Sequence, residues 1–230
     1  MEHDNEPSDA HSLEDLLHRR YSCRAFLETP VPLETIRRIL TIAQRTPTWC
    51  NTQSWRVWLT GPVATRELAS ALQERARSGR WAGYDLEEPL YEGVSLDRRR
   101  EAGYGLYSAL GIDREDREAR RLQALENYRF FNAPNYMVVT AERALGSYGI
   151  LDCGAYVGNV LLAAEAVGVA SIAQGAVARH SDYLRSHFGI GAERVIVCGV
   201  ALGFADEEHP ANQFRTTRAT IDEAVTWCGI

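Results

Sequence analysis

The segment YGILDCGAYVGNVLLAAEAV, residues 148–167, decides the fold class because it is apolar on most sides. Its apolar residues recur at helical spacing, and Gly168 follows at the position where helices commonly turn into the left-handed conformation. A helix without a polar face must be buried, either inside a domain or between subunits. We therefore predict a long buried helix whose apolar residues include Leu151, Ala155, Val160, Leu161, Ala163 and Ala164.

The segments around this helix mix helices and strands without the strict strand–helix–strand order of a parallel α/β protein. We predict strands at 55–59, 136–140, 169–173 and 194–202, and helices at 12–20, 32–46, 64–77, 96–107, 113–128 and 182–188. Neither a repeat nor a linker interrupts the chain, so we predict an α+β fold with a single domain at residues 12–230. The acidic, polar residues 1–11 are expected to be disordered.

Composition excludes several classes of function. The net charge of −6 disfavours nucleic-acid binding, which needs a basic face. All 25 basic residues are arginine, so a Schiff-base lysine and a P-loop lysine are both excluded. The five cysteines are scattered and the histidines lack ligand spacing, which argues against disulfides and a metal site. No secretory signal or membrane span is recognisable, which predicts a cytoplasmic location.

Two polar segments lie in the first quarter of the chain. Arg20-Tyr21-Ser22-Cys23-Arg24 combines arginine forks with a hydroxyl, a set that suits a phosphate but also a solvated helix end. The segment 47–55, PTWCNTQSW, offers amide donors and acceptors that fit the edge of a planar heterocycle. The same residues are equally typical of a turn between a helix and a strand.

Two further segments lie near the C-terminus. Ala173-Gln174-Gly175-Ala176 follows a predicted core strand, and its glycine permits close approach of a ligand or simply a turn. Arg215 and Arg218 could complete a phosphate site or remain rim charges. The chain lacks both a GxGxxG dinucleotide motif and a GxSxG nucleophile motif. A bound cofactor that performs its own redox chemistry is consistent with this pattern.

In this order, the four segments resemble the nitroreductase family of FMN-dependent oxidoreductases. The first matches the family's Arg-Arg/His-Ser-x-Arg/Lys run, and 47–55 matches Pro-Ser-x-x-Asn-x-Gln-Pro-Trp, with Thr48 and Ser54 as departures. Phe130-Phe131-Asn132-Ala133-Pro134 is similar to the branch of nitrobenzoate-type reductases. The resemblance covers residues 12–228 and implies a mixed central sheet flanked by helices. It further implies an intertwined homodimer, with two interfacial FMN sites and C-terminal extensions that cross to the partner.

The resemblance also implies roles for individual residues. Arg20, Ser22 and Arg218 would hold the FMN phosphate and ribityl end, with Arg215 as a further candidate. Tyr21, between Arg20 and Ser22, belongs to the same cofactor-binding run. Arg24 would lie near the pyrimidine end of the flavin, where a cation favours the reduced anion. The remaining cofactor contacts would come from Asn51 and Gln53, from backbone at Ala173, Gln174 and Gly175, and from the partner's Pro47 and Thr48.

The reaction implied is hydride transfer from NAD(P)H through FMN to a nitroaromatic, quinone or similar small acceptor, by a ping-pong mechanism without a catalytic side chain. Candidates for the substrate wall are Trp81, Tyr84, Tyr91, Phe130 and Phe131. Alternatives within the fold are dehalogenation, azoline oxidation, flavin breakdown or flavin binding without turnover. A dimer that binds no flavin, with the arginines as surface charge, is a further alternative. The sequence leaves open the choice between NADH and NADPH.

Overall fold

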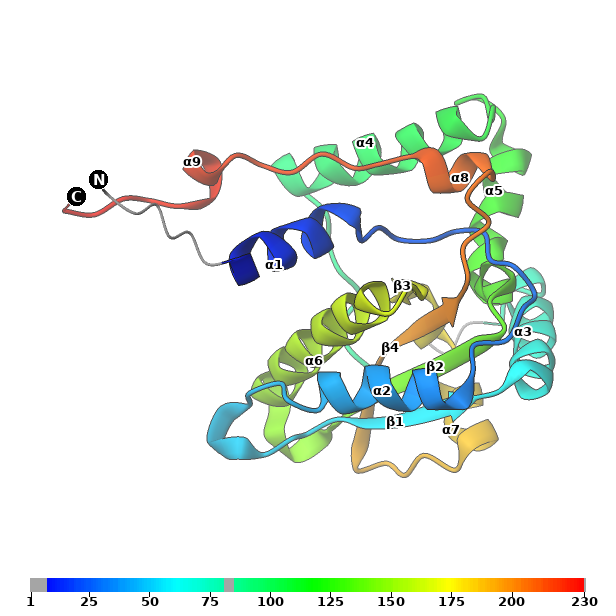
Figure 1. Cartoon of the computed structure of the whole chain (residues 1–230). Coiled ribbons are helices and arrows are strands. Elements are labelled where there is room, and N and C mark those ends of the chain that lie inside the picture. The colour runs from blue at the N-terminus through cyan, green and yellow to red at the C-terminus, as the bar shows by residue number, and fades with distance from the viewer. Residues whose placement is uncertain (1–7, 81–84, 230) are drawn as a thin grey trace.

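A four-stranded sheet organises the computed structural model, which describes residues 8–80 and 85–229 (Figure 1). The strand order is β1-β2-β4-β3, with β1 at Arg56–Thr60, β2 at Asn135–Glu142, β3 at Ala170–Gln174 and β4 at Arg194–Gly203. All three strand pairings are antiparallel, and the parallel contact found among the described residues is an isolated bridge between Ser22 and Ser171. The predicted α+β class is confirmed.

Helices account for most of the remaining chain. The larger ones are α1 (Ser8–Arg19), α2 (Leu33–Ala43), α3 (Pro62–Arg77), α4 (Gly93–Ala109), α5 (Arg117–Leu125), α6 (Gly146–Ala166) and α7 (Ser181–Phe188). The C-terminal region carries the short α8 (Pro210–Gln213) and α9 (Ile221–Ala224). Short 3₁₀ segments occur at Trp49–Asn51, Arg143–Leu145 and Ala176–Arg179, and a longer one with a kink at Glu126–Asn132. The first helix begins at Ser8, four positions before the predicted Ser12.

Side chains of the central strand β2 alternate between two cores. Tyr136 and Val138 face a core that includes Leu68 and Leu72 of α3, whereas Met137 and Val139 face one built with α2 and α6. This alternation is the period-two pattern of a strand buried on both sides. The sheet is therefore the middle layer, with α2 and α6 over one face and α3 over the other (Figure 1).

The helix that decided the fold class is present as α6, but one chain does not bury all of it. Cys153, Val160 and Ala164 pack in the core beneath α2, whereas Leu151 is 69% exposed. Helix α4 has no buried residue and lies beside the extended chain between α8 and α9, clear of the sheet (Figure 1). The fold thus leaves large apolar surfaces uncovered.

The buried side chain of His180 makes the stability of the fold depend on pH. Its side chain is fully buried, and burial followed by the nearby Arg75 cation lowers its pKa below the ordinary value of about 6.5. The unfolded chain therefore binds the proton more tightly than the folded chain. The contribution of His180 to the free energy of unfolding is complete above about pH 6.5 and is lost as the pH falls below that value. We expect urea unfolding between pH 7 and pH 5 to show a shallower fall for His180→Gln. Equal slopes in the unaltered chain and in His180→Gln would contradict the assignment.

Candidate active site

Arginine side chains from opposite ends of the sequence meet in one cavity. The cavity has a volume of about 280 Å³ and is lined by Leu17, His18, Arg20, Tyr21, Ser22, Arg24, Phe214, Arg215, Thr216 and Arg218. Five of the residues predicted from the first and fourth polar segments are thus brought together, with Tyr21 beside them. The chain after α8 runs back past the end of α1, and this path produces the meeting (Figure 1).

The arginine charges of this cavity oppose one another, as Arg20 and Arg218 show. Burial lowers the pKa of Arg20, and the neighbouring Arg218 lowers it further; burial also lowers the pKa of Arg24. Arg24 donates to the Ser22 carbonyl at 3.1 Å, and the Arg215 guanidinium lies 3.8 Å from the centre of the Tyr21 ring. Like charges held this close repel, so a polyanion placed among them would be strongly attracted.

Asn212 fixes the geometry of the arginine cavity. Its Oδ1 accepts from the Arg24 backbone N–H at 2.7 Å, and its Nδ2 donates to the carbonyls of Ala25 and Asp206, both at 2.8 Å. The buried amide therefore joins the segment at 22–25 to the C-terminal arm. Asn212 had no predicted role, although it lies three positions before Arg215, because its partners are distant in sequence.

Replacing Asn212 by alanine should lower the free energy of unfolding by about 2 kcal/mol, since the Arg24 backbone N–H and the buried Ala25 carbonyl both lose their partner. We expect the same variant to bind cofactor more weakly, because Arg24 loses its anchor. Chemical denaturation and flavin titration measure the two effects. Gln213→Ala alters the next, exposed amide and should change stability by less than about 0.5 kcal/mol. Equal stability of both variants would show that the hydrogen bonds of Asn212 do not stabilise the fold.

Strand β3 connects the arginine cavity to the Gly175 turn. Ser22 bridges to Ser171, and the Cys23 N–H donates to the Ser171 carbonyl at 3.1 Å. Gly175 lies four positions further along the same strand direction, which is roughly 13 Å at about 3.3 Å per residue. Ala173 and Gln174 lie between these points. A ligand of that length could therefore have one end at the arginines and the other at Gly175.

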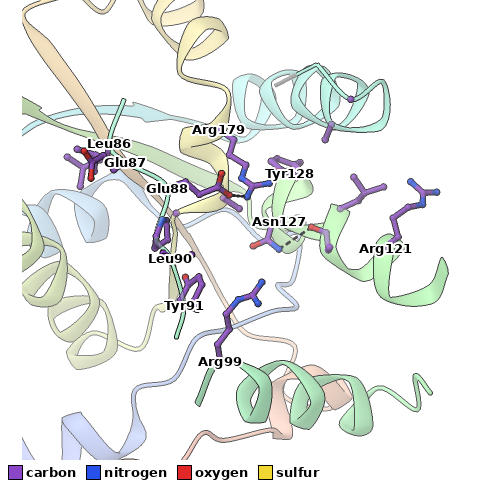
Figure 2. Close-up of a pocket in the computed structure, with 18 of the residues that line it drawn as sticks. Leu86, Glu87, Glu88, Leu90, Tyr91, Arg99, Arg121, Asn127, Tyr128 and Arg179 are labelled. Carbon is purple, nitrogen blue, oxygen red and sulfur yellow. Dashed lines mark hydrogen bonds and ion pairs between the residues drawn. The ribbon is translucent and has the colours of Figure 1, made fainter. Parts of the chain in front are cut away.

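A larger cavity opens at Gly175. Its volume is about 1050 Å³, and its walls come from the segment 86–91, from α4 and α5, and from the turn that contains Ala176 and Arg179 (Figure 2). The buried Gln174 donates from Nε2 to the Asn127 carbonyl at 2.8 Å, while none of the described residues donates to its Oε1. Asn127 itself lines the cavity, and the sequence offered no signal for it apart from the neighbouring Phe130-Phe131 motif.

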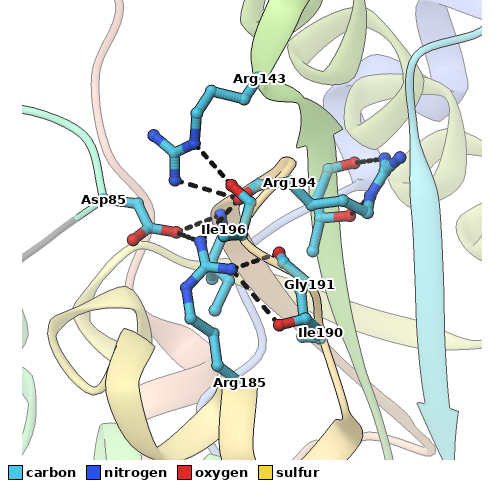
Figure 3. Close-up of polar contacts among 9 residues, drawn as sticks. Asp85, Arg143, Arg185, Ile190, Gly191, Arg194 and Ile196 are labelled. Carbon is cyan, nitrogen blue, oxygen red and sulfur yellow. Dashed lines mark hydrogen bonds and ion pairs between the residues drawn. The ribbon is translucent and has the colours of Figure 1, made fainter.

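One wall of this large cavity is held by Asp85. Its carboxylate pairs with Arg185 and accepts from the Ile196 N–H at 2.8 Å, at the part of β4 that extends beyond β3 (Figure 3). Arg185 also donates to the carbonyls of Gly191 and Arg194, each at 2.6 Å. The carboxylate thereby accepts a hydrogen bond from a backbone N–H at the open edge of the sheet, and it fixes the start of the segment 86–91. Sequence reasoning missed Asp85, because nothing local marks it.

The segment 47–55 lies away from the arginine cavity. Its Trp49 N–H donates to Asp152 at 3.3 Å near the start of α6, whereas Arg19 pairs with Glu165 near the end of that helix. The two acidic residues are 13 positions apart, roughly 20 Å along a helix. Within this segment, positive φ angles at Asn51 and Gln53 produce a tight loop. One chain therefore does not bring Pro47, Thr48, Asn51 and Gln53 to its own arginines.

The candidates for the substrate wall separate into three groups. Tyr91 lines the large cavity. Phe130 and Phe131 do not line this cavity, because consecutive positive φ angles turn both rings into the core, where Phe130 stacks on Tyr136 with ring centres 3.6 Å apart. Their place in a substrate wall stays a prediction. Trp81 and Tyr84 lie outside the described residues.

Neither a metal site nor a membrane helix emerges from the part of the chain that the structure describes. Within 8–80 and 85–229, no cluster of three histidine, cysteine or acidic side chains has the arrangement to hold a metal ion. In the same residues, no helix combines the length and apolar character needed to cross a bilayer.

Comparisons with known proteins show which proteins this chain resembles. The model of the Nitroreductase family matches residues 17–204. A 4-nitrobenzoate reductase of Nocardioides sp. is 33% identical over 92% of this chain and 88% of its own. A chloronitrobenzene nitroreductase of Comamonas testosteroni is 32% identical over 94% and 96%. The crystal structure of the FMN-dependent nitroreductase NfnB from Mycobacterium smegmatis in complex with NADPH superposes with a TM-score of 0.91 at 30% identity, covering 96% of this chain and all of that one.

Proposed function

The chain belongs to the nitroreductase family, and on that premise we propose that residues 12–230 form one FMN-binding domain that transfers hydride from NAD(P)H to nitroaromatic or quinone acceptors. The observation that carries the proposal is the pair of cavities joined by β3, one lined by arginines and the other open at Gly175. Nitroreductase relatives are described as FMN- and NADPH-dependent. An NAD(P)H-dependent reaction is also consistent with the expected cytoplasmic location.

The residues present fit FMN. The repelling arginines at Arg20 and Arg218 suit a phosphate, with Ser22 as a further donor and Arg215 positioned by Tyr21. The edge of β3 and the backbone at Gly175 can lie along a flat ring, and the orphaned Gln174 Oε1 can accept from a ring N–H. When bound, FMN supplies the two-electron chemistry that none of the protein side chains provides.

The chain's own contribution is binding and electrostatics. Arg24 presents a half-buried cation whose pKa burial lowers, and a cation in this position favours negative charge that develops nearby. The large cavity orients donor and acceptor, and one cavity that serves both in turn implies ping-pong kinetics. For a nitro acceptor the balance is ArNO₂ + NAD(P)H + H⁺ → ArNO + NAD(P)⁺ + H₂O. The acceptor is reduced by two electrons while one oxygen leaves as water.

We further propose that the active unit is a homodimer. The apolar surfaces that one chain leaves exposed are large, and they include Leu151 on α6, Trp49 in the 47–55 loop and Trp227 in the C-terminal arm. Obligate dimer interfaces have this character. A partner's loop could supply Pro47, Thr48, Asn51 and Gln53 to the site from which this chain's own loop is distant. The C-terminal arm would then cross to the partner, and analytical ultracentrifugation would measure the resulting mass.

Steady-state turnover tests the proposal directly. Purified protein supplied with FMN should oxidise NADPH or NADH continuously when 4-nitrotoluene or a benzoquinone is present, and chromatography should show reduced acceptor in matching amounts. Parallel lines in double-reciprocal plots at several acceptor concentrations would support ping-pong order. Loss of flavin without acceptor reduction would indicate flavin breakdown instead. Bound FMN without either change would reduce the proposal to a flavin-binding protein.

A further inference from the structure

The large cavity contains an arginine whose charge is not matched by a carboxylate. Four arginines line the cavity, and two of them form ion pairs: Arg179 with Glu88, and Arg121 with Glu118 through two contacts of 2.7 Å (Figure 2). Arg77, in the last turn of α3, is exposed. The Arg99 guanidinium forms no ion pair with a described acidic residue and lies against an aromatic ring of the cavity wall. Its central carbon lies 4.8 Å from the centre of the Tyr91 ring.

Helix geometry explains why Arg99 alone of three consecutive arginines serves the cavity. Successive residues of a helix point about 100° apart. Arg98 therefore reaches Glu223 in the C-terminal arm at 3.9 Å, and Arg100 reaches Asp97 on its own helix at 4.0 Å. Only Arg99 of the three lines the cavity, where it points into the space between Tyr91 and Asn127 (Figure 2).

We propose that this cavity selects aromatic acceptors that carry an anionic group, and that Arg99 binds that group. The inference rests on the proposed function, since it assigns a substrate class to the same site. A guanidinium fork matches a carboxylate through two parallel hydrogen bonds. Tyr91 holds the fork from one side, and Leu90, Leu96 and Ala176 provide apolar surface for the rest of a flat molecule. The reacting group can then lie toward Gly175 while the acid group lies at Arg99.

A matched pair of acceptors tests the selectivity in the FMN-loaded enzyme. The unaltered enzyme should reduce 4-nitrobenzoate with a kcat/KM at least about 10-fold higher than that for the neutral 4-nitrobenzamide. In Arg99→Gln this ratio should fall to about one, mainly through KM for the acid. Arg100→Gln removes an adjacent charge that does not line the cavity, and it should retain the ratio. A preference for the acid that survives in Arg99→Gln would overturn the proposal.

Two further measurements separate this inference from its alternatives. Non-reducible 4-methylbenzoate should perturb the visible spectrum of the FMN-loaded protein at concentrations at least about 10-fold lower than in Arg99→Gln. Equal titrations in the two proteins would overturn the proposal even if nitroaromatic turnover is robust, whereas a normal titration without turnover would fault only the proposed reaction. If Arg99→Gln raises KM for NADPH but not for NADH or the acid, the anion is the donor's phosphate and the assignment is wrong.

Discussion

FMN should bind roughly 10²–10⁴-fold more weakly to the Arg20→Gln/Arg218→Gln double variant than to the unaltered chain. Each arginine would lose a charge-assisted contact with the phosphate, and such contacts contribute about 1.5–3 kcal/mol each. Both side chains line the same small cavity, and Arg218 is among the causes that lower the pKa of Arg20. Fluorescence titration of FMN into the apoprotein measures the dissociation constant, with thermal unfolding as a check that the fold is retained.

Arg19→Gln provides the matched control for this double variant. Arg19 precedes Arg20 directly, but it pairs with Glu165 and does not line the cavity. A loss of one exposed ion pair costs at most about 1 kcal/mol and should leave FMN affinity within a few-fold. Equal dissociation constants for the double variant and the unaltered chain would refute the phosphate assignment.

Gly199→Ala should lower the free energy of unfolding by about 3 kcal/mol, at the upper end of the range for overpacking a core. A Cβ at this position would lie 1.7 Å from Tyr136 Oη and 2.3 Å from its Cζ. The phenol cannot move aside easily, because it is fully buried and stacked on Phe130. Urea denaturation followed by circular dichroism gives the change in stability.

The control for this position is Gly61→Ser, where a Cβ meets nothing within 4 Å. Serine also suits the N-cap of α3 that Gly61 occupies, so stability should remain within about 0.5 kcal/mol. Equal stability of Gly199→Ala and the unaltered chain would mean that Tyr136 has an alternative position in the core.

The secondary structure was largely predictable because hydrophobic periodicity is local. The predicted strand at 194–202 and the helix at 182–188 match β4 and α7 to within one residue at each end. The helix predicted at 113–128 is shorter, because Asp116 caps it by accepting from the Ala119 N–H at 2.9 Å, and a 3₁₀ turn replaces its end. That turn was not predictable, since the positive φ angles at Phe130 and Phe131 depend on what the rings pack against.

The residues of the candidate site also divide into those that the sequence predicts and those that it does not. Clustered arginines and a glycine turn are visible in the sequence, and the structure brings the arginines of both ends of the chain together. The residues that position them were missed because their partners are remote: Asn212 contacts Arg24 across 188 positions and Asp85 contacts Ile196 across 111. No local pattern encodes such contacts. The placement of the 47–55 loop away from the arginines also depends on remote contacts, because Trp49 binds Asp152 near the start of α6 and Arg19 binds Glu165 near its end.

The visible absorption spectrum of the purified protein, followed by chromatography of the chromophore released on heating, tests the central claim most directly. The account predicts a yellow protein that releases FMN in a ratio close to one per chain, because each chain carries one arginine cavity joined to one Gly175 turn. A colourless protein that also fails to take up added FMN would contradict it.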